Sequence, residues 1–131
     1  MLFERNLEDF TTDPSASVLV TLKKITELKS RIVMVVDENQ HLVGVVSNGD
    51  VLRWLTKFES PSLASPISDV MNRNFTFVTE DSTSEEIQYK LQSVNYLPQI
   101  NDHNQLQAII SNTTQIHLKI GQSLISPNSP C

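Results

Sequence analysis

The sequence predicts a mixed α+β fold made of two similar halves, each in the order helix, strand, strand, helix. Residues 32–36 and 42–46 are apolar, β-branched runs joined by a polar turn at 37–40, which is the pattern of a β-hairpin. A shift of 64 positions lays residues 32–50 on residues 96–114, so the chain contains an internal duplication and a second hairpin. Helical periodicity flanks the hairpins.

The first hairpin is apolar at nearly every strand position, which indicates a sheet covered on both faces, at least one of them by helices. Upstream, apolar residues recur at helical spacing and predict one helix face, made of Val18, Leu22, Ile25 and Leu28. Downstream, residues 47–50 offer N-cap chemistry to a second helix. We expect the apolar face of that helix to contain Val51, Leu52, Leu55 and Phe58.

The second copy starts with a short strand at 75–78 and a capping-box-like segment at 81–86. The helix that follows carries Ile87, Leu91 and Val94. A Pro/Ser-rich connector at 60–66 joins the copies, and halves of about 60 residues are near the lower limit for independent folding, so we expect one packed body. We divide the chain into a first repeat with its lead-in (1–64), a second repeat (65–118) and a tail (119–131) expected to be poorly ordered.

The composition is that of a folded domain that binds neither nucleic acid nor membrane. Among 131 residues, 39% are hydrophobic, and the formal net charge of -5 comes without any basic stripe for a nucleic-acid polymer. The longest apolar stretches are five residues, against the roughly 20 that cross a bilayer. The first residues have neither the basic nor the apolar region of a secretion signal, so we expect a cytoplasmic protein.

Nothing in the sequence predicts catalysis or a metal site. The one cysteine is Cys131, and His41, His103 and His117 lack the short spacing of a ligand pair. The adjacent acids at 37–38 and 85–86 fall in a turn and in the first turn of a helix, where negative charge is favourable. We therefore expect no enzyme, no catalytic residue and no cofactor.

The segment from Gly44 to Asp50 runs from a strand directly into a helix N-terminus. Gly44 leaves room beside the strand, Ser47 offers a hydroxyl, and the free N–H groups of the first helical turn attract an anion. Asp50 supplies an acceptor for sugar hydroxyls. The alternative is purely structural: Ser47 caps the helix, the negative charge of Asp50 interacts favourably with the helix dipole, and Gly44 permits close packing.

Residues 31–54 and 66–74, taken with the duplication, resemble a tandem CBS-domain pair, the Bateman module. The likeness extends over roughly residues 10 to 118 and implies two β-α-β-β-α repeats packed around a pseudo-twofold axis. The amino-acid sequence of the segment also resembles the CBS pair ahead of some bacterial sugar-nucleotidyltransferase (nucleotide-sugar pyrophosphorylase) domains, although this chain contains no such catalytic domain.

The resemblance implies that residues 44–50 bind an adenine nucleotide, AMP, ADP or ATP. It assigns Ser47 to ribose or phosphate and Asp50 to the ribose hydroxyls. The remaining candidates are two adenine-flanking residues, two residues at the rim and two arginines for phosphate: Ile32, Val33, Thr11, Thr12, Arg73 and Arg53. The second copy keeps Ser111 but has Thr114 in place of the acid, which puts a second site in doubt.

These features predict a regulatory module that senses an adenine nucleotide and controls a sugar-nucleotidyltransferase or a similar enzyme. The alternative is a ligand-free assembly module. Because the helix faces hold more apolar side chains than one small sheet covers, we also expect a homodimer, with Trp54 either in the core or as an anchor in the dimer interface.

Overall fold

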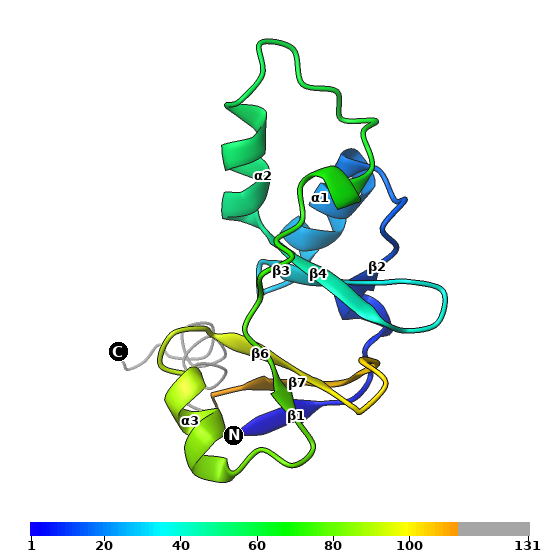
Figure 1. Ribbon diagram of the computed structural model, residues 1–131. Helices are drawn as coiled ribbons and strands as arrows, with labels where there is room; N and C mark the ends of the chain where they lie inside the picture. Colours follow the sequence, from blue (N-terminus) through cyan, green and yellow to red (C-terminus); the bar gives the residue numbers. More distant parts are fainter. Residues whose placement is uncertain (113–131) are drawn as a thin grey trace.

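The computed structural model describes residues 1–112 and consists of two layers, each an antiparallel hairpin sheet with helices on its outer side (Figure 1). The first layer contains β2 (Thr11–Thr12), α1 (Val18–Glu27), β3 (Ile32–Val36), β4 (Leu42–Ser47) and α2 (Asn48–Leu55). The second contains β1 (Leu2–Glu4), β5 (Val78–Thr79), α3 (Ser84–Lys90), β6 (Tyr96–Ile100) and β7 (Leu106–Ser111). Two 3-10 turns, η1 (Glu8–Phe10) and η2 (Ile67–Asp69), lie in the connections.

Both sheets have the same internal plan. The strand order is β2-β3-β4 in the first and β1-β7-β6-β5 in the second. In each, a short strand runs parallel to the first strand of the hairpin, and the hairpin strands are antiparallel. The mixed α+β class is thereby confirmed: the first repeat has the predicted order β-α-β-β-α, and the described part of the second has β-α-β-β. Thr113, Thr114, the predicted end of the second repeat at 118, His117, Cys131 and the tail 119–131 lie outside the described residues.

The duplication predicted at a shift of 64 holds strand by strand. Ile32 pairs with Ser47, and 64 positions later Tyr96 pairs with Ser111. Both hairpins also carry a register irregularity at the same place, just before Val36 in one and just before Ile100 in the other. The two sheets are therefore copies in register as well as in element order.

The hairpin turns of the two repeats bind each other reciprocally. The N–H of Leu42 donates to the carbonyl of Asn104, and the N–H of Leu106 donates to the carbonyl of Gln40, both at 3.0 Å. Gln40 and Asn104 share a left-handed backbone, with φ of 68° and 62°. Since each bond is the other's copy, the pseudo-twofold axis passes between these turns.

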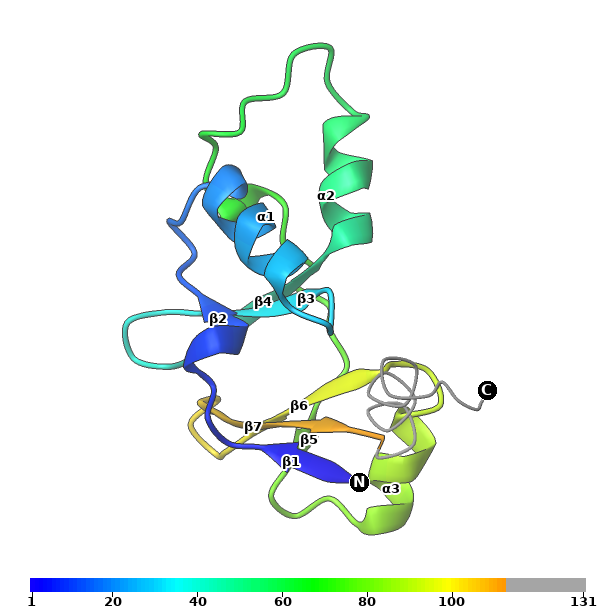
Figure 2. The same ribbon diagram turned by 180° about the vertical axis from the view of Figure 1, so that it is seen from behind.

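The core consists of three apolar clusters, one between the two layers and one within each layer. The inner faces of both sheets meet in one cluster that includes Met34, Leu42, Ile100 and Ile109. A second cluster joins β3 and β4 to α1 and α2, and a third joins β6 and β7 to α3. Figure 2 shows the same arrangement from behind, with the sheets facing each other and the helices outside.

The buried face of α2 differs from the predicted one. Val51 and Trp54 are buried, whereas Leu52 is 62% exposed. Phe58 lies beyond the helix end at Leu55 and touches Trp54 edge to face, with ring centroids 5.7 Å apart. The prediction was right for Val51 and Leu55. It was wrong for Phe58 because the helix ends before that residue, and for Leu52 because the core face of the helix runs through Val51 and Trp54 instead. Trp54 is part of the core.

The short strand predicted at 75–78 is displaced to Val78–Thr79. The Phe75 and Phe77 rings pack edge to face, with centroids 6.0 Å apart. Lys90 Nζ donates to the Phe77 carbonyl at 2.8 Å, so this carbonyl serves a side chain instead of a strand ladder.

The lead-in of each repeat joins the sheet of the other, which the sequence analysis did not foresee. Residues 4–6 begin at the pairing of Glu4 with Ile109 of β7, and residues 72–74 begin at a bridge from Asn72 to Val45 of β4. In both segments the first side chain accepts a hydrogen bond from the N–H two residues later at 3.0 Å. The duplication thus extends into the lead-ins, and their exchange ties the two layers together.

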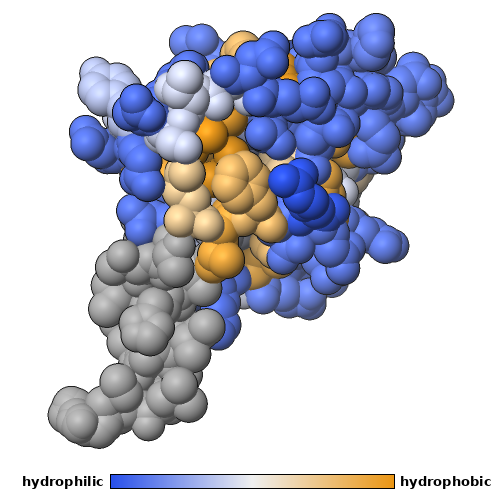
Figure 3. Space-filling model, turned by 90° about the horizontal axis from the view of Figure 1, so that it is seen from below, coloured by the Kyte–Doolittle hydropathy of each residue, from blue (hydrophilic) through white to orange (hydrophobic). Residues whose placement is uncertain are grey.

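The second layer has less helical cover within residues 1–112, because α3 is the one helix described on it. Seen from below, an apolar patch lies open on this layer (Figure 3). The layer carries Leu2 and Phe3 on β1, which are 41% and 38% exposed.

Gly44 provides the first testable prediction. A Cβ there would lie 2.6 Å from Met71 Sδ, so Gly44→Ala should lower the free energy of unfolding by about 1–3 kcal/mol through overpacking. Urea denaturation measures the change. Gly49→Ala is the matched control, since its Cβ would meet the mobile end of Arg53 at 3.3 Å and alanine favours a helix. Equal stabilities of the Gly44 variant and the parent chain would contradict this account.

The second testable prediction concerns the carboxylate of Asp37. Backbone N–H groups of His41 and Asn39 hydrogen-bond its carboxylate and hold its pKa below the ordinary value. The ionised form therefore stabilises the fold above about pH 3.9, and this contribution is lost as the pH falls through the folded-state pKa. Asn101 makes the same two bonds in the second repeat, so Asp37→Asn should keep the turn.

The expected result is a shallower fall in the free energy of unfolding below pH 4 for Asp37→Asn than for the parent chain. Urea titrations at several pH values measure the slope. Glu38→Gln, which removes the neighbouring exposed charge, should keep the parent's slope. An Asp37→Asn slope as steep as the parent's would show that this carboxylate does not contribute.

Candidate functional site

A cavity of about 540 Å³ opens where β4 ends and α2 begins. Its volume is in the range of small-molecule sites, roughly 300–1,000 Å³. Its wall comes from the entry to β3, the β4–α2 junction, the inter-repeat linker and the start of β6. The main lining residues are Ser30, Arg31, Ile32, Val45, Ser47, Asn48, Gly49, Asp50, Arg53, Asn72, Asn74, Phe75, Thr76, Val94, Asn95, Tyr96 and Pro98. Both repeats therefore contribute to one site.

The junction is organised by a reciprocal helix cap. Ser47 Oγ accepts the Asp50 N–H at 3.2 Å, and the Asp50 carboxylate Oδ2 accepts the Ser47 N–H at 2.9 Å. The Ser47 hydroxyl also lies 3.1 Å from the same carboxylate oxygen. The purely structural role that the sequence allowed, in which Ser47 and Asp50 cap the helix, is therefore present in the structure. It fixes both side chains at the mouth of the cavity, where they remain part of its lining.

The charges around the cavity favour an anion. Two arginines, Arg31 and Arg53, and one acid, Asp50, line it. Arg53 Nη2 lies 2.6 Å from Asp50 Oδ1, and Arg31 remains as a further positive group, with Nη1 3.4 Å from the Thr26 carbonyl. Arg31 has φ of 56°, a left-handed conformation uncommon outside glycine, at the turn that enters β3.

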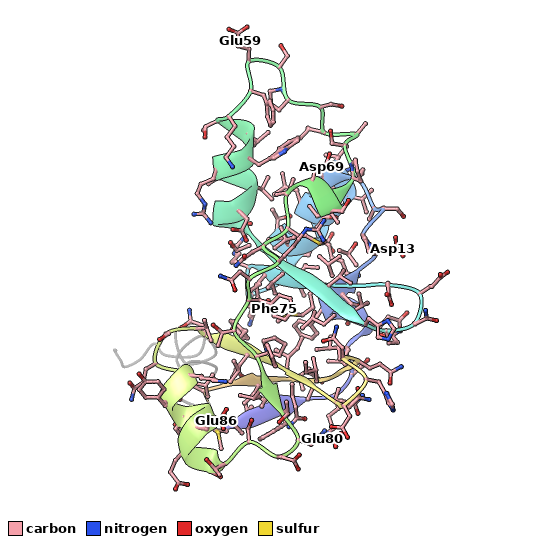
Figure 4. The ribbon with its side chains drawn as sticks, viewed as in Figure 1. Asp13, Glu59, Asp69, Phe75, Glu80 and Glu86 are labelled. Atoms are coloured by element: carbon pink, nitrogen blue, oxygen red, sulfur yellow. The ribbon has the colours of Figure 1, made fainter. Side chains whose placement is uncertain are left out.

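The opposite wall is aromatic and amide-rich. Tyr96 and Pro98 of β6 and Phe75 of the linker supply flat or apolar surface, and Asn72 and Asn74 supply amides. Figure 4 shows Phe75 between the two layers, where the linker passes from one to the other. The labelled acids Asp13, Glu59, Asp69, Glu80 and Glu86 lie away from it on the outer parts of the molecule.

The structure brings some of the sequence candidates together and leaves others apart. Ile32, Ser47, Asp50 and Arg53 line the cavity. Val33 is fully buried in the outer cluster of the first layer. The remaining candidates lie outside the lining: Gly44 packs on Met71, Thr11 and Thr12 pair with β3, and Arg73 donates to the Ser68 carbonyl at 3.3 Å.

Several cavity residues escaped sequence reasoning, above all Arg31, Asn72, Asn74 and Tyr96. A signal for one was present, because the shift of 64 that pairs the repeats places Tyr96 opposite Ile32. The sequence carried no comparable signal for Asn72 and Asn74, since the position of the linker depends on how the two repeats pack.

The described residues offer acceptors, donors and apolar surface, which suit recognition of a polar anionic molecule. Within residues 1–112, no three His, Cys, Asp or Glu side chains gather where they could hold a metal ion. In the same part of the chain, every helix is too short or too polar to span a bilayer.

Comparison with known proteins identifies a CBS domain, whose family model matches residues 7–57. A search of curated proteins found no match. Solved structures of CBS-domain proteins share the fold. A CBS domain protein from Streptococcus pneumoniae TIGR4 superimposes with a TM-score of 0.77 at 16% identity, covering 99% of this chain and 86% of that one.

Two further similar structures contain nucleotides. CbpB in complex with c-di-AMP has a TM-score of 0.72 at 20% identity, covering 87% of this chain and 77% of that one. CBSX2 in complex with AMP has a TM-score of 0.71 at 24% identity, covering 92% of this chain and 94% of that one. At these identities the likeness establishes the α+β fold that this chain shares with CBS-domain proteins.

Proposed function

We propose that this chain is a regulatory module that binds one adenine nucleotide, AMP, ADP or ATP, in the cavity between its repeats. The observation that carries the proposal is the placement of the Ser47–Asp50 cap beside two arginines and opposite the start of β6. The CBS domain at residues 7–57 and the nucleotide complexes of CbpB and CBSX2 support it.

Each part of a nucleotide has a matching surface. Asp50 can accept hydrogen bonds from ribose hydroxyls, with Ser47 beside it. The phosphate belongs near Arg31 and Arg53, whose guanidinium groups form charge-assisted hydrogen bonds with phosphate oxygens. The adenine ring belongs against Ile32 and the opposite aromatic wall, because flat apolar surface favours stacking.

A single ligand per chain follows from how the repeats have diverged. The position of Arg31 is taken in the second repeat by Asn95, and the lead-in equivalent of Asn72 is Glu4, an acid. The sequence also has Thr114 where the first repeat has Asp50. At these three positions the second repeat has one positive group fewer and the same number of acids, so its net charge is more negative, which disfavours a phosphate.

A ligand in this cavity would bridge the first repeat and the start of β6 in the second, so its binding would change how firmly the layers are joined. That coupling is the basis for a regulatory role. The resemblance to CBS pairs ahead of bacterial sugar-nucleotidyltransferase domains makes an enzyme of that class the first candidate for the regulated partner.

The second candidate function is a ligand-free assembly module, favoured by exposed apolar side chains on the first-layer helices and just beyond α2. Val20, Leu52 and Phe58 are 57%, 62% and 54% exposed. Such side chains on neighbouring helices can form a dimer interface, and we propose a homodimer through this face.

Calorimetry tests the nucleotide proposal. Titration with AMP, ADP or ATP should give about one ligand per chain. Asp50→Ala should weaken binding about ten- to a hundredfold, since a charge-assisted hydrogen bond contributes roughly 1.5–3 kcal/mol. Thr114→Ala should change little.

The matched control for the cap is Thr83→Ala. Thr83 Oγ1 accepts the Glu86 N–H at 3.1 Å at the start of α3, so its loss should cost about as much stability as a cap normally does, roughly 1 kcal/mol, without changing affinity. No binding of any adenine nucleotide at millimolar concentration would leave the assembly function standing. Full affinity in Asp50→Ala would place the site elsewhere.

Light scattering at tens of micromolar tests the homodimer, which should have twice the 14.8 kDa chain mass. A Leu52→Glu and Phe58→Glu double variant should return the monomer mass, because it places charges in the contact. Tyr89→Glu, a change at a 72% exposed residue on α3, should leave the dimer intact. A monomeric parent chain would contradict the proposal.

A further inference from the structure

We propose that the ligand of this cavity is a nucleoside diphosphate sugar, whose sugar hydroxyls bind the side chains of Asn74 and Thr76 on the inter-repeat linker. Such a ligand is ADP with a hexose on its outer phosphate, so the proposal rests on the proposed function and narrows its ligand class. Sugar-nucleotidyltransferases form nucleotide sugars, so the ligand belongs to the product class of the first candidate partner.

The parts of ADP match most of the cavity and leave its linker side unused. Asp50 and Ser47 match the ribose, and Arg31 and Arg53 match the two phosphates. The adenine belongs against the apolar lining residues, all of which are buried or half-buried. The polar linker side chains are exposed, so they lie at the rim, where a group attached to the outer phosphate leaves the cavity.

Asn74 and Thr76 are available to a ligand. Among residues 1–112, neither side chain has a hydrogen-bond partner. The backbone beneath them is fixed, because the Asn74 N–H donates to Asn72 Oδ1 at 3.0 Å and Asn72 exchanges two backbone hydrogen bonds with Val45. Figure 4 shows Phe75, which lies between them in the chain, where the linker crosses from one layer to the other. The two polar groups are therefore preorganised.

The chemistry of this pair suits a sugar better than a further phosphate. An amide and a hydroxyl both donate and accept hydrogen bonds, as sugar hydroxyls do, and neither is charged. The linker carries one positive residue near them, Arg73, but its guanidinium donates to the Ser68 carbonyl and lies outside the cavity lining. The third phosphate of ATP would therefore find no positive partner on the linker, whereas a hexose would find two neutral ones.

Calorimetry with ADP-glucose and ADP tests the proposal. Charge alone favours ADP, because ADP keeps a terminal phosphate charge that ADP-glucose lacks and the two arginines attract it. ADP-glucose should nevertheless bind the parent chain about tenfold more tightly than ADP, since it adds hydrogen bonds to the linker.

Asn74→Ala and Thr76→Val each remove one of these hydrogen-bonding groups. Each should weaken ADP-glucose binding about threefold and leave ADP binding unchanged, so the double variant should bind ADP-glucose no more tightly than ADP. Asn6→Ala is the matched control. Asn6 has the place of Asn74 in the other lead-in, where its N–H donates to Glu4, and it lies outside the cavity lining, so both affinities should stay at the parent values.

The other outcomes separate this proposal from the proposed function. ADP that binds the parent chain as tightly as ADP-glucose overturns the sugar and leaves nucleotide binding standing. Variants that weaken both ligands equally, or neither, also overturn it, because the linker side chains then do not meet the sugar. Tighter binding of c-di-AMP than of ADP-glucose would assign the linker side to a second nucleoside instead. A parent chain that binds no adenine nucleotide overturns both proposals.

Discussion

The reciprocal hydrogen bonds between the two hairpin turns determine the geometry of the rest of the molecule. Leu42 donates to Asn104 and Leu106 donates to Gln40, so the sheets are joined at the turn end of each hairpin. The buried inner cluster continues this contact along the strands. The other ends of the strands, where β3 and β6 begin and β4 finishes, come together at the end of the molecule away from the turns. The cavity lies there, which is why residues 30–32 and 94–96, a shift of 64 apart, line the same space.

The first hairpin could be predicted because β3 and β4 are rich in β-branched residues, and the repeat in sequence carries the same register into the second copy. The helices that cover the sheets were harder to predict, because the end of a helix determines which residues of an apolar pattern belong to its buried face. α2 stops at Leu55, so Phe58 falls outside the helix. Within the helix, Trp54 joins Val51 on the core face in place of Leu52. The exchanged lead-ins could not be read from strand patterns at all, since β1 is three residues long and the linker contributes a single bridge at Asn72.

The residues of the candidate site also fall into those that local sequence predicts and those that depend on tertiary packing. Ser47 and Asp50 could be predicted because a strand that leads directly into a helix needs a cap, and capping residues are recognisable in sequence. Arg31 and Asn72 belong to the cavity only because two repeats pack against each other, and no local pattern carries that information. Gly44 is the instructive case. The sequence indicates open space beside it, and the structure fills that space with the side chain of Met71.

Asp50 therefore has two roles that need not exclude each other. As a capping residue it satisfies backbone groups that any helix start leaves free, and this requirement exists with or without a ligand. As a ligand acceptor it offers Oδ1, which accepts one hydrogen bond from Arg53 and has a further lone pair. The cap keeps the carboxylate in place, so the site is preorganised without being blocked. A structural role for Ser47 and Asp50 thus supports a binding role, because a side chain fixed by its own helix loses little freedom when a ligand arrives.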